Sequence, residues 1–226
     1  MVNLAAALGK DGISAFRFDF AGNGESEGSF QYGNYYREVE DLRAIVQHFR
    51  EKKYVITAIV GHSKVSMENV VFRRFAGNVV FCRFVGGNVV LLYASKYKDI
   101  HTIVNISGRF NLARGKIMFR VTEESLMDRL NTITHLACLS IPENCRVLTV
   151  HGSMDETVPA EDALEFSKFI LNHELCIIEG ADHEYTCHQD ELTSLVLEFI
   201  KVHHDKENNT SKQTRFGRVD KPIHYR

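Results

Sequence analysis

Short apolar segments that alternate with amphipathic helical segments constrain the fold of this chain more than any other feature of its sequence. The apolar segments are rich in β-branched and aromatic residues, which predicts strands at 13–20, 54–61, 100–108, 145–153 and 174–180. Helical spacing and capping signals predict helices at 34–52, 87–97, 122–131, 160–170 and 190–204. Such alternation implies an α/β fold with a mostly parallel sheet and helices on both faces.

The length and the ends of the chain bound its domain organisation. A chain of 226 residues is long enough for one α/β domain with a sizeable core. We expect that domain at residues 1–204, and residues 1–12 look like the end of a helix rather than a signal peptide, because no basic region precedes their apolar residues. Residues 205–226 are polar and show no periodicity, which predicts a disordered tail.

Charge and cysteine content argue against several classes of protein. A formal net charge of -2 gives no reason to expect a nucleic-acid or membrane partner. No apolar run reaches the length of about 20 residues that a membrane span requires. The 5 cysteines are odd in number and lack Cys-x-x-Cys spacing, which favours reduced thiols and a cytoplasmic location.

Ser63, Asp155 and His183 each lie at or just beyond the end of a predicted strand. Side chains at the carboxyl ends of neighbouring parallel strands converge on one crevice. Ser63 is a poor nucleophile until a neighbouring base takes its proton, and His183 can do so near neutral pH. Asp155 would fix the tautomer of the imidazole and stabilise the imidazolium as it forms.

Four stretches of the sequence carry a resemblance to a known family. They read FRFDFAGNGESEG, IVGHSK, VLTVHGSMDETVP and IEGADHEY, and with the helices between them they cover most of residues 2–202. They resemble the serine aminopeptidase-like, cinnamoyl or feruloyl esterase-like group of α/β-hydrolases, including the small cytosolic members found in plants. Ser63, Asp155 and His183 also follow the chain order of an α/β-hydrolase triad.

The resemblance implies an α/β-hydrolase fold and a serine hydrolase that cleaves small carboxylic esters, or other acyl bonds, through an acyl-serine intermediate. Ser63, His183 and Asp155 would form the catalytic triad. The backbone N–H of Lys64 would be one donor to the oxyanion. We expect a small-molecule ester as partner, with no cofactor and no metal, and the oligomeric state stays open.

Several of these residues also have a structural interpretation. Ser63 is compatible with an ordinary serine at the end of a strand. The glycines of 21–28 do not fit Gly-x-Gly-x-x-Gly, so a structural turn is favoured over a phosphate-binding loop. His183, His188 and Cys187 lack the spacing of a tetrahedral zinc set. We expect His62 to pack beside the serine rather than to act as a second base.

The turn after Ser63 departs from the pattern of a nucleophile elbow. Gly-x-Ser-x-Gly requires glycine where this chain has Val65, and the next Gly-Gly pair is Gly86-Gly87. The intervening segment contains a tandem repeat, NVVFRRFAG followed by NVVFCRFVG. Removal of residues 65–85 would restore GHSKGG, so we interpret these residues as an insertion in the elbow. The alternative is a β-hairpin lobe built from the two NVVF copies.

Two further departures from the family pattern bear on activity. The pattern has a His-Gly segment after an early strand, which supplies a second oxyanion N–H and would precede the first helix. Its lack predicts an N-terminally truncated sheet whose open edge favours association. The link at Gly115-Lys116 is abrupt where relatives have a longer helical cap, which predicts a reduced cap. The alternative function is therefore a catalytically impaired hydrolase-fold variant, or a binding protein that uses the same crevice.

Overall fold

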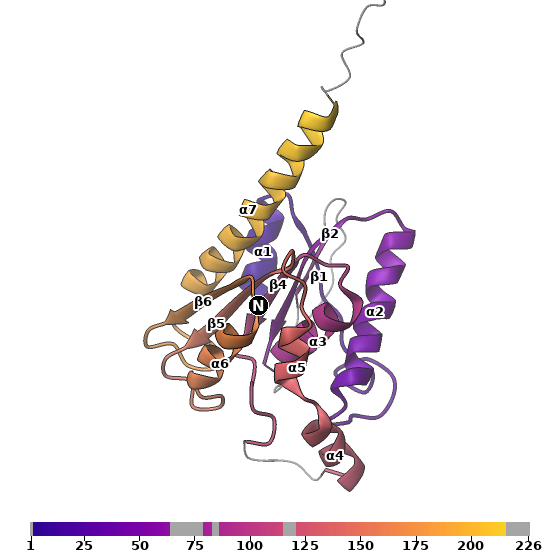
Figure 1. Ribbon diagram of the computed structural model, residues 1–226, viewed down its shortest axis with the longest axis vertical. Helices are drawn as coiled ribbons and strands as arrows, with labels where there is room; N and C mark the ends of the chain where they lie inside the picture. Colours follow the sequence, from indigo (N-terminus) through magenta and orange to yellow (C-terminus); the bar gives the residue numbers. More distant parts are fainter. Residues whose placement is uncertain (1, 64–78, 83–85, 115–120, 216–226) are drawn as a thin grey trace, which may run out of the picture.

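The structure is a computed structural model that describes residues 2–63, 79–82, 86–114 and 121–215 (Figure 1). Within these ranges the strands form one sheet in the order β1-β3-β2-β4-β5-β6, and every pairing is parallel. The strands are β1 (Ser14–Phe16), β2 (Ile56–His62), β3 (Val79–Cys82), β4 (Thr102–Ile106), β5 (Arg146–Gly152) and β6 (His173–Ile178). The prediction of an α/β fold built on a parallel sheet is confirmed.

Helices cover both faces of this sheet and bury a separate core on each (Figure 1). The helices are α1 (Val2–Lys10), α2 (Tyr35–Glu51), α3 (Gly87–Tyr97), α4 (Glu123–Asn131), α5 (Thr134–Leu139), α6 (Glu161–Phe169) and α7 (Gln189–Arg215). Side chains of α1 and α7 pack into one core, and those of α2, α3, α5 and α6 into the other. Successive strand residues alternate between the cores, as Ile103 and Val104 do, because side chains of a strand point to opposite faces.

Side-chain caps and one close backbone approach define where three of the helices begin. Asn34 caps α2 by accepting a hydrogen bond from the Arg37 N–H at 3.1 Å. Thr122 caps α4 in the same way, from the Ser125 N–H at 3.2 Å. At the start of α3, a Cβ on Gly87 would lie 2.0 Å from Asn105 Oδ1, so only glycine lets this helix begin so close to β4.

The first strand is shorter than predicted. The sequence suggested a strand over 13–20, whereas β1 pairs with β3 only at Ser14–Phe16. The chain then turns, because Asp19 organises the loop that follows: its carbonyl accepts the Ser26 hydroxyl at 2.7 Å, and its carboxylate accepts the Glu25 N–H at 3.4 Å. Polar groups that bond within a loop compete with a strand ladder, which ends β1 early.

Residues 79–82 of the repeat belong to the main sheet. β3 lies between β1 and β2, with Val80 in register with Ala15 on one side and Ala58 on the other. Both of its edges are therefore occupied, and the hairpin alternative is wrong for these residues, because half of an antiparallel hairpin would pair with the other copy. Lys64, Val65 and the first NVVF copy lie outside the described residues, so the proposed insertion is described only at 79–82.

The last helix is longer than predicted. We expected a helix over 190–204 and a disordered tail over 205–226, but α7 continues to Arg215, which corrects the tail prediction for 205–215. No glycine or proline interrupts the sequence between Gln189 and Arg215, so nothing in the chain chemistry ends the helix at 204. Residues 216–226 lie outside the described ranges.

The segment between β4 and β5 contains the helices α4 and α5. The sequence predicted α4, but it did not predict the short α5. Arg129 anchors α4, donating to the Tyr35 hydroxyl and to the Leu112 carbonyl, both at 2.8 Å. The predicted abrupt link at Gly115-Lys116 lies outside the described residues. Among the described helices, none combines the length and the apolar character needed to cross a bilayer.

Candidate active site

The candidate site lies where three parallel strands end. Ile106 of β4 is in register with His62 of β2 and with Val150 of β5. Gly152 of β5 is in turn in register with Ile178 of β6. The chain segments that follow β2, β5 and β6 therefore leave the sheet at the same edge, and they carry Ser63, Asp155 and His183.

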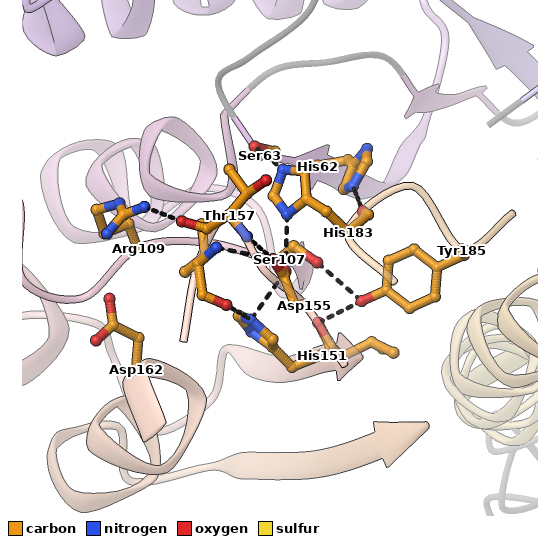
Figure 2. A network of polar contacts seen from close by, with 12 residues as sticks. His62, Ser63, Ser107, Arg109, His151, Asp155, Thr157, Asp162, His183 and Tyr185 are labelled. Carbon is orange, nitrogen blue, oxygen red and sulfur yellow. Dashed lines mark hydrogen bonds and ion pairs between the residues drawn. The ribbon is translucent and has the colours of Figure 1, made fainter. Parts of the chain in front are cut away.

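Ser63 follows β2 directly and has an unusual backbone conformation. Its φ is 39°, in the left-handed region that a residue with a Cβ adopts at a cost of about 1–3 kcal/mol. Its N–H donates to the Ile106 carbonyl at 2.9 Å, which ties it to the end of β4. The residue is buried, and its hydroxyl points at His183 (Figure 2). The strained backbone conformation of Ser63 thus directs its hydroxyl toward the imidazole of His183.

Asp155 lies in the turn after β5, and its carboxylate is fully buried. Oδ1 accepts the N–H groups of Thr157 at 2.9 Å and Val158 at 2.7 Å. Oδ2 accepts from His183 at 2.7 Å and lies 3.2 Å from a ring nitrogen of His151. Burial raises the pKa of Asp155, but the hydrogen bonds from His151, His183 and the Val158 N–H outweigh it and hold that pKa well below its usual range. The carboxylate is therefore ionised at neutral pH.

His183 lies beyond β6 and contacts both of the other side chains. Its Nδ1 is 2.7 Å from Asp155 Oδ2, and its Nε2 is 2.6 Å from Ser63 Oγ (Figure 2). Because a carboxylate only accepts, Nδ1 carries the hydrogen, and the neutral ring turns the lone pair of Nε2 toward the serine hydroxyl. The structure thus brings all three sequence-predicted side chains into one chain of hydrogen bonds.

Other buried side chains support this arrangement, and no sequence pattern predicted their hydrogen bonds. Nε2 of His62 donates to the His183 carbonyl at 2.9 Å. Burial, with a contribution from the nearby His183, lowers the pKa of His62 to about 3, so this ring is neutral. Its hydrogen bond holds the backbone at His183. Tyr185 is fully buried, and its hydroxyl bonds Ser107 Oγ at 2.9 Å and the Val150 carbonyl at 3.2 Å. These contacts fix the loop that carries His183.

Two further residues singled out in the sequence, Lys64 and Cys187, do not belong to the described part of this site. Lys64, the expected oxyanion donor, lies outside the described residues. Cys187 is exposed, and no group of three or more His, Cys, Asp or Glu side chains in the described part is arranged to hold a metal ion. The described part of the site therefore consists of a hydroxyl, an imidazole and a carboxylate.

Comparison with solved structures identifies the architecture. Est1E from Butyrivibrio proteoclasticus, solved with ferulic acid bound, superposes with a TM-score of 0.70 at 22% identity, over 90% of this chain and 82% of that chain. A monoacylglycerol lipase from Paleococcus ferrophilus gives 0.67 at 17% identity, over 89% and 88%. The chain has the α/β-hydrolase fold.

Further comparisons support the fold but no narrower family. The esterase Pf2001 of Pyrococcus furiosus gives a TM-score of 0.62 at 21% identity, over 86% of this chain and 72% of that chain. No family model and no curated protein sequence matches the chain. Likeness at these identities shows a common fold, and it gives no support to the narrower prediction of a plant cytosolic type.

Proposed function

We propose that this protein is a serine hydrolase that cleaves small carboxylic esters. Ser63 is the nucleophile, His183 the general base and Asp155 the carboxylate that orients the imidazole. The proposal rests on one observation, the continuous hydrogen-bonded chain from Ser63 Oγ through both nitrogens of His183 to Asp155 Oδ2, with distances of 2.6 and 2.7 Å. Reaction at a carbonyl carbon needs an activated hydroxyl, and this chain of contacts supplies one.

In the proposed reaction, His183 Nε2 takes the hydroxyl proton as Ser63 Oγ forms a bond to the ester carbonyl carbon. The tetrahedral intermediate collapses when the bond to the alcohol oxygen breaks and His183 returns the proton to that oxygen. Water then attacks the acyl-serine with His183 again as base, releasing the carboxylic acid and regenerating the serine. Asp155 stabilises the imidazolium in both halves.

The oxyanion of each intermediate also needs hydrogen-bond donors. We propose the backbone N–H of Lys64 as one donor, since it follows the nucleophile directly. Loss of one such donor lowers the rate by about 10²–10³-fold. The segment after Ser63 therefore bears on how fast the enzyme is, while the triad determines the class of reaction.

A second candidate function has its own observation. In an intact elbow, a helix begins just after the serine, whereas here the next described helix, α3, begins at Gly87. If residues 65–85 are an insertion that displaces this helix from the serine, the alternative is a hydrolase-fold variant with impaired catalysis, or a binding protein that uses the same crevice. The esterase proposal is preferred because Ser63, His183 and Asp155 are joined by the two hydrogen bonds that the proposed reaction uses.

The substrate class and cellular location complete the proposal. The similar structures include an esterase and a monoacylglycerol lipase, which supports small acyl esters as substrates. The proposed reaction uses no cofactor. Four free cysteines are found among the described side chains, and burial raises the pKa of Cys138 and Cys145 to about 12, so these two thiols are unreactive. We propose a cytoplasmic location on this basis.

Covalent labelling tests the proposed function. A fluorophosphonate probe should attach to the purified protein at Ser63, and p-nitrophenyl acetate should be hydrolysed. Both activities should vanish in Ser63→Ala and persist in Ser140→Ala, which changes an exposed serine at the end of α5. Labelling that survives Ser63→Ala, or a folded wild type that is never labelled, would overturn the proposal.

A further inference from the structure

A second imidazole contacts the carboxylate of the candidate site. His151 lies on β5 and is fully buried. Its Nε2 is 2.9 Å from the Val158 carbonyl oxygen and 3.2 Å from Asp155 Oδ2 (Figure 2). The proposed reaction assigns this ring no part, although it touches the same oxygen atom as His183.

The contacts of His151 define its protonation state. A carbonyl oxygen and a carboxylate oxygen both accept, so Nε2 must carry a hydrogen that the two oxygens share. Nδ1 is buried without a hydrogen-bond partner in the described part of the structure. A hydrogen on Nδ1 would be an unsatisfied buried donor, which is costly. His151 is therefore the neutral Nε2–H tautomer and contributes a hydrogen bond without a positive charge.

His151 also closes a small ring of contacts around Asp155. The Val158 N–H donates to Asp155 Oδ1 at 2.7 Å, and the Val158 carbonyl accepts from His151. The same imidazole N–H reaches Asp155 Oδ2. Both oxygens of the carboxylate are thus held from the side of β5, and the remaining direction of Oδ2 is left to His183.

We propose that His151 is a positioning residue, which shares Asp155 Oδ2 with His183 and so limits how strongly the carboxylate holds the His183 proton. The role rests on the proposed hydrolase function and extends it. A carboxylate that already accepts one N–H attracts a second one less strongly. His183 then releases its proton to the leaving alcohol more readily, while the fixed carboxylate keeps the ring aimed at Ser63.

Other polar groups near the pair do not duplicate this contact. In the described part of the chain, the titratable and charged groups around Asp155 and His183 include His62 from β2, Arg109 from the segment after β4, His151 from β5, Asp162 from α6, and Asp182, Glu184 and Tyr185 from the loop after β6. Arg109 donates to the Thr157 carbonyl, and Asp162 accepts the Phe110 N–H at 2.9 Å. Among the described side chains, only His183 and His151 donate to Asp155.

Three substitutions at His151 separate positioning from mere packing. His151→Phe keeps a ring but has no donor. His151→Gln places an amide N–H close to the position of Nε2, whereas the shorter His151→Asn reaches only the position of Nδ1. The first readout is the rate of fluorophosphonate labelling as a function of pH. The second, independent of catalysis, is the downfield proton resonance of the His183 Nδ1–H···Asp155 hydrogen bond.

We expect the acid side of the labelling profile to respond most clearly. Labelling falls at low pH because protonated His183 cannot take the serine proton. Without the His151 donor, Asp155 stabilises protonated His183 more strongly, so the midpoint of the acid limb should move up by about half a pH unit in His151→Phe and His151→Asn. The rate on the plateau should fall by about 10-fold because the carboxylate is less well fixed. His151→Gln should restore both values, and the downfield resonance should move in the Phe and Asn variants only.

The outcomes distinguish this role from the proposed function. A labelled wild type whose Phe and Asn variants keep the wild-type midpoint, or lose rate equally at every pH, would overturn the positioning role and leave the hydrolase assignment standing. A wild type that is not labelled, but whose resonance moves in the Phe variant and returns in the Gln variant, would overturn the hydrolase assignment and retain the contact. If the wild type is not labelled and its resonance does not respond to the substitutions at His151, both the hydrolase assignment and the positioning role are overturned.

Discussion

The two halves of the candidate site are held by different means. The acid–base half, Asp155 and His183, follows the adjacent strands β5 and β6, and several hydrogen bonds fix both side chains. The nucleophile half depends on a strained backbone at Ser63, tied to β4 by one N–H to the Ile106 carbonyl. A strained backbone conformation persists only when the surrounding structure holds it, so the nucleophile half depends more on the neighbouring chain.

The largest expected effect comes from the acid–base half. Asp155→Asn replaces an oxygen that accepts the His183 Nδ1–H with an amide that offers a donor, so the imidazole should adopt the wrong tautomer. The labelling rate at neutral pH should fall by about 10⁴-fold. The matched control is Glu156→Gln, which neutralises the exposed neighbouring carboxylate and should leave the rate unchanged. Equal rates for Asp155→Asn and wild type would show that Asp155 does not orient the base.

A smaller effect tests the segment next to the nucleophile half. An internal strand directs its backbone N–H groups at neighbouring strands, so Val80→Pro should lower the free energy of unfolding by about 3 kcal/mol or more. Val80→Thr keeps the N–H and the β-branch and should cost less. Urea denaturation of both variants gives the comparison. A tolerated proline would remove β3 from the interior of the sheet and support the view of 65–85 as a dispensable insertion.

The smallest effect measures the strain at the nucleophile itself. Glycine adopts a φ of 39° without the penalty of a Cβ, while alanine retains it. Ser63→Gly should therefore be about 1 kcal/mol more stable than Ser63→Ala in urea denaturation, although both lack the hydroxyl. Equal stabilities would mean that Ser63 is not strained, and the contrast between the two halves would disappear.

Much of the fold could be read from periodicity and local signals. The spacing of Val39, Leu42 and Val46 predicts α2, and Thr122 marks the start of α4, because these patterns express interactions between residues close in sequence. Short apolar runs such as 54–61 and 145–153 predicted β2 and β5, but neither their order in the sheet nor the early end of β1 could be read from them. Strand order depends on contacts between distant segments, which leave no local pattern.

The sequence by itself determined the α/β class and the three side chains of the candidate site, because Ser63, Asp155 and His183 each follow an apolar run and parallel strands end at a common edge. Only the tertiary structure decided that β3 lies inside the sheet and that His62 and His151 bond to the same group of residues. Those contacts join residues far apart along the chain, or depend on which way a buried ring turns. Packing and hydrogen bonding fix these contacts and ring orientations only when the whole domain is assembled.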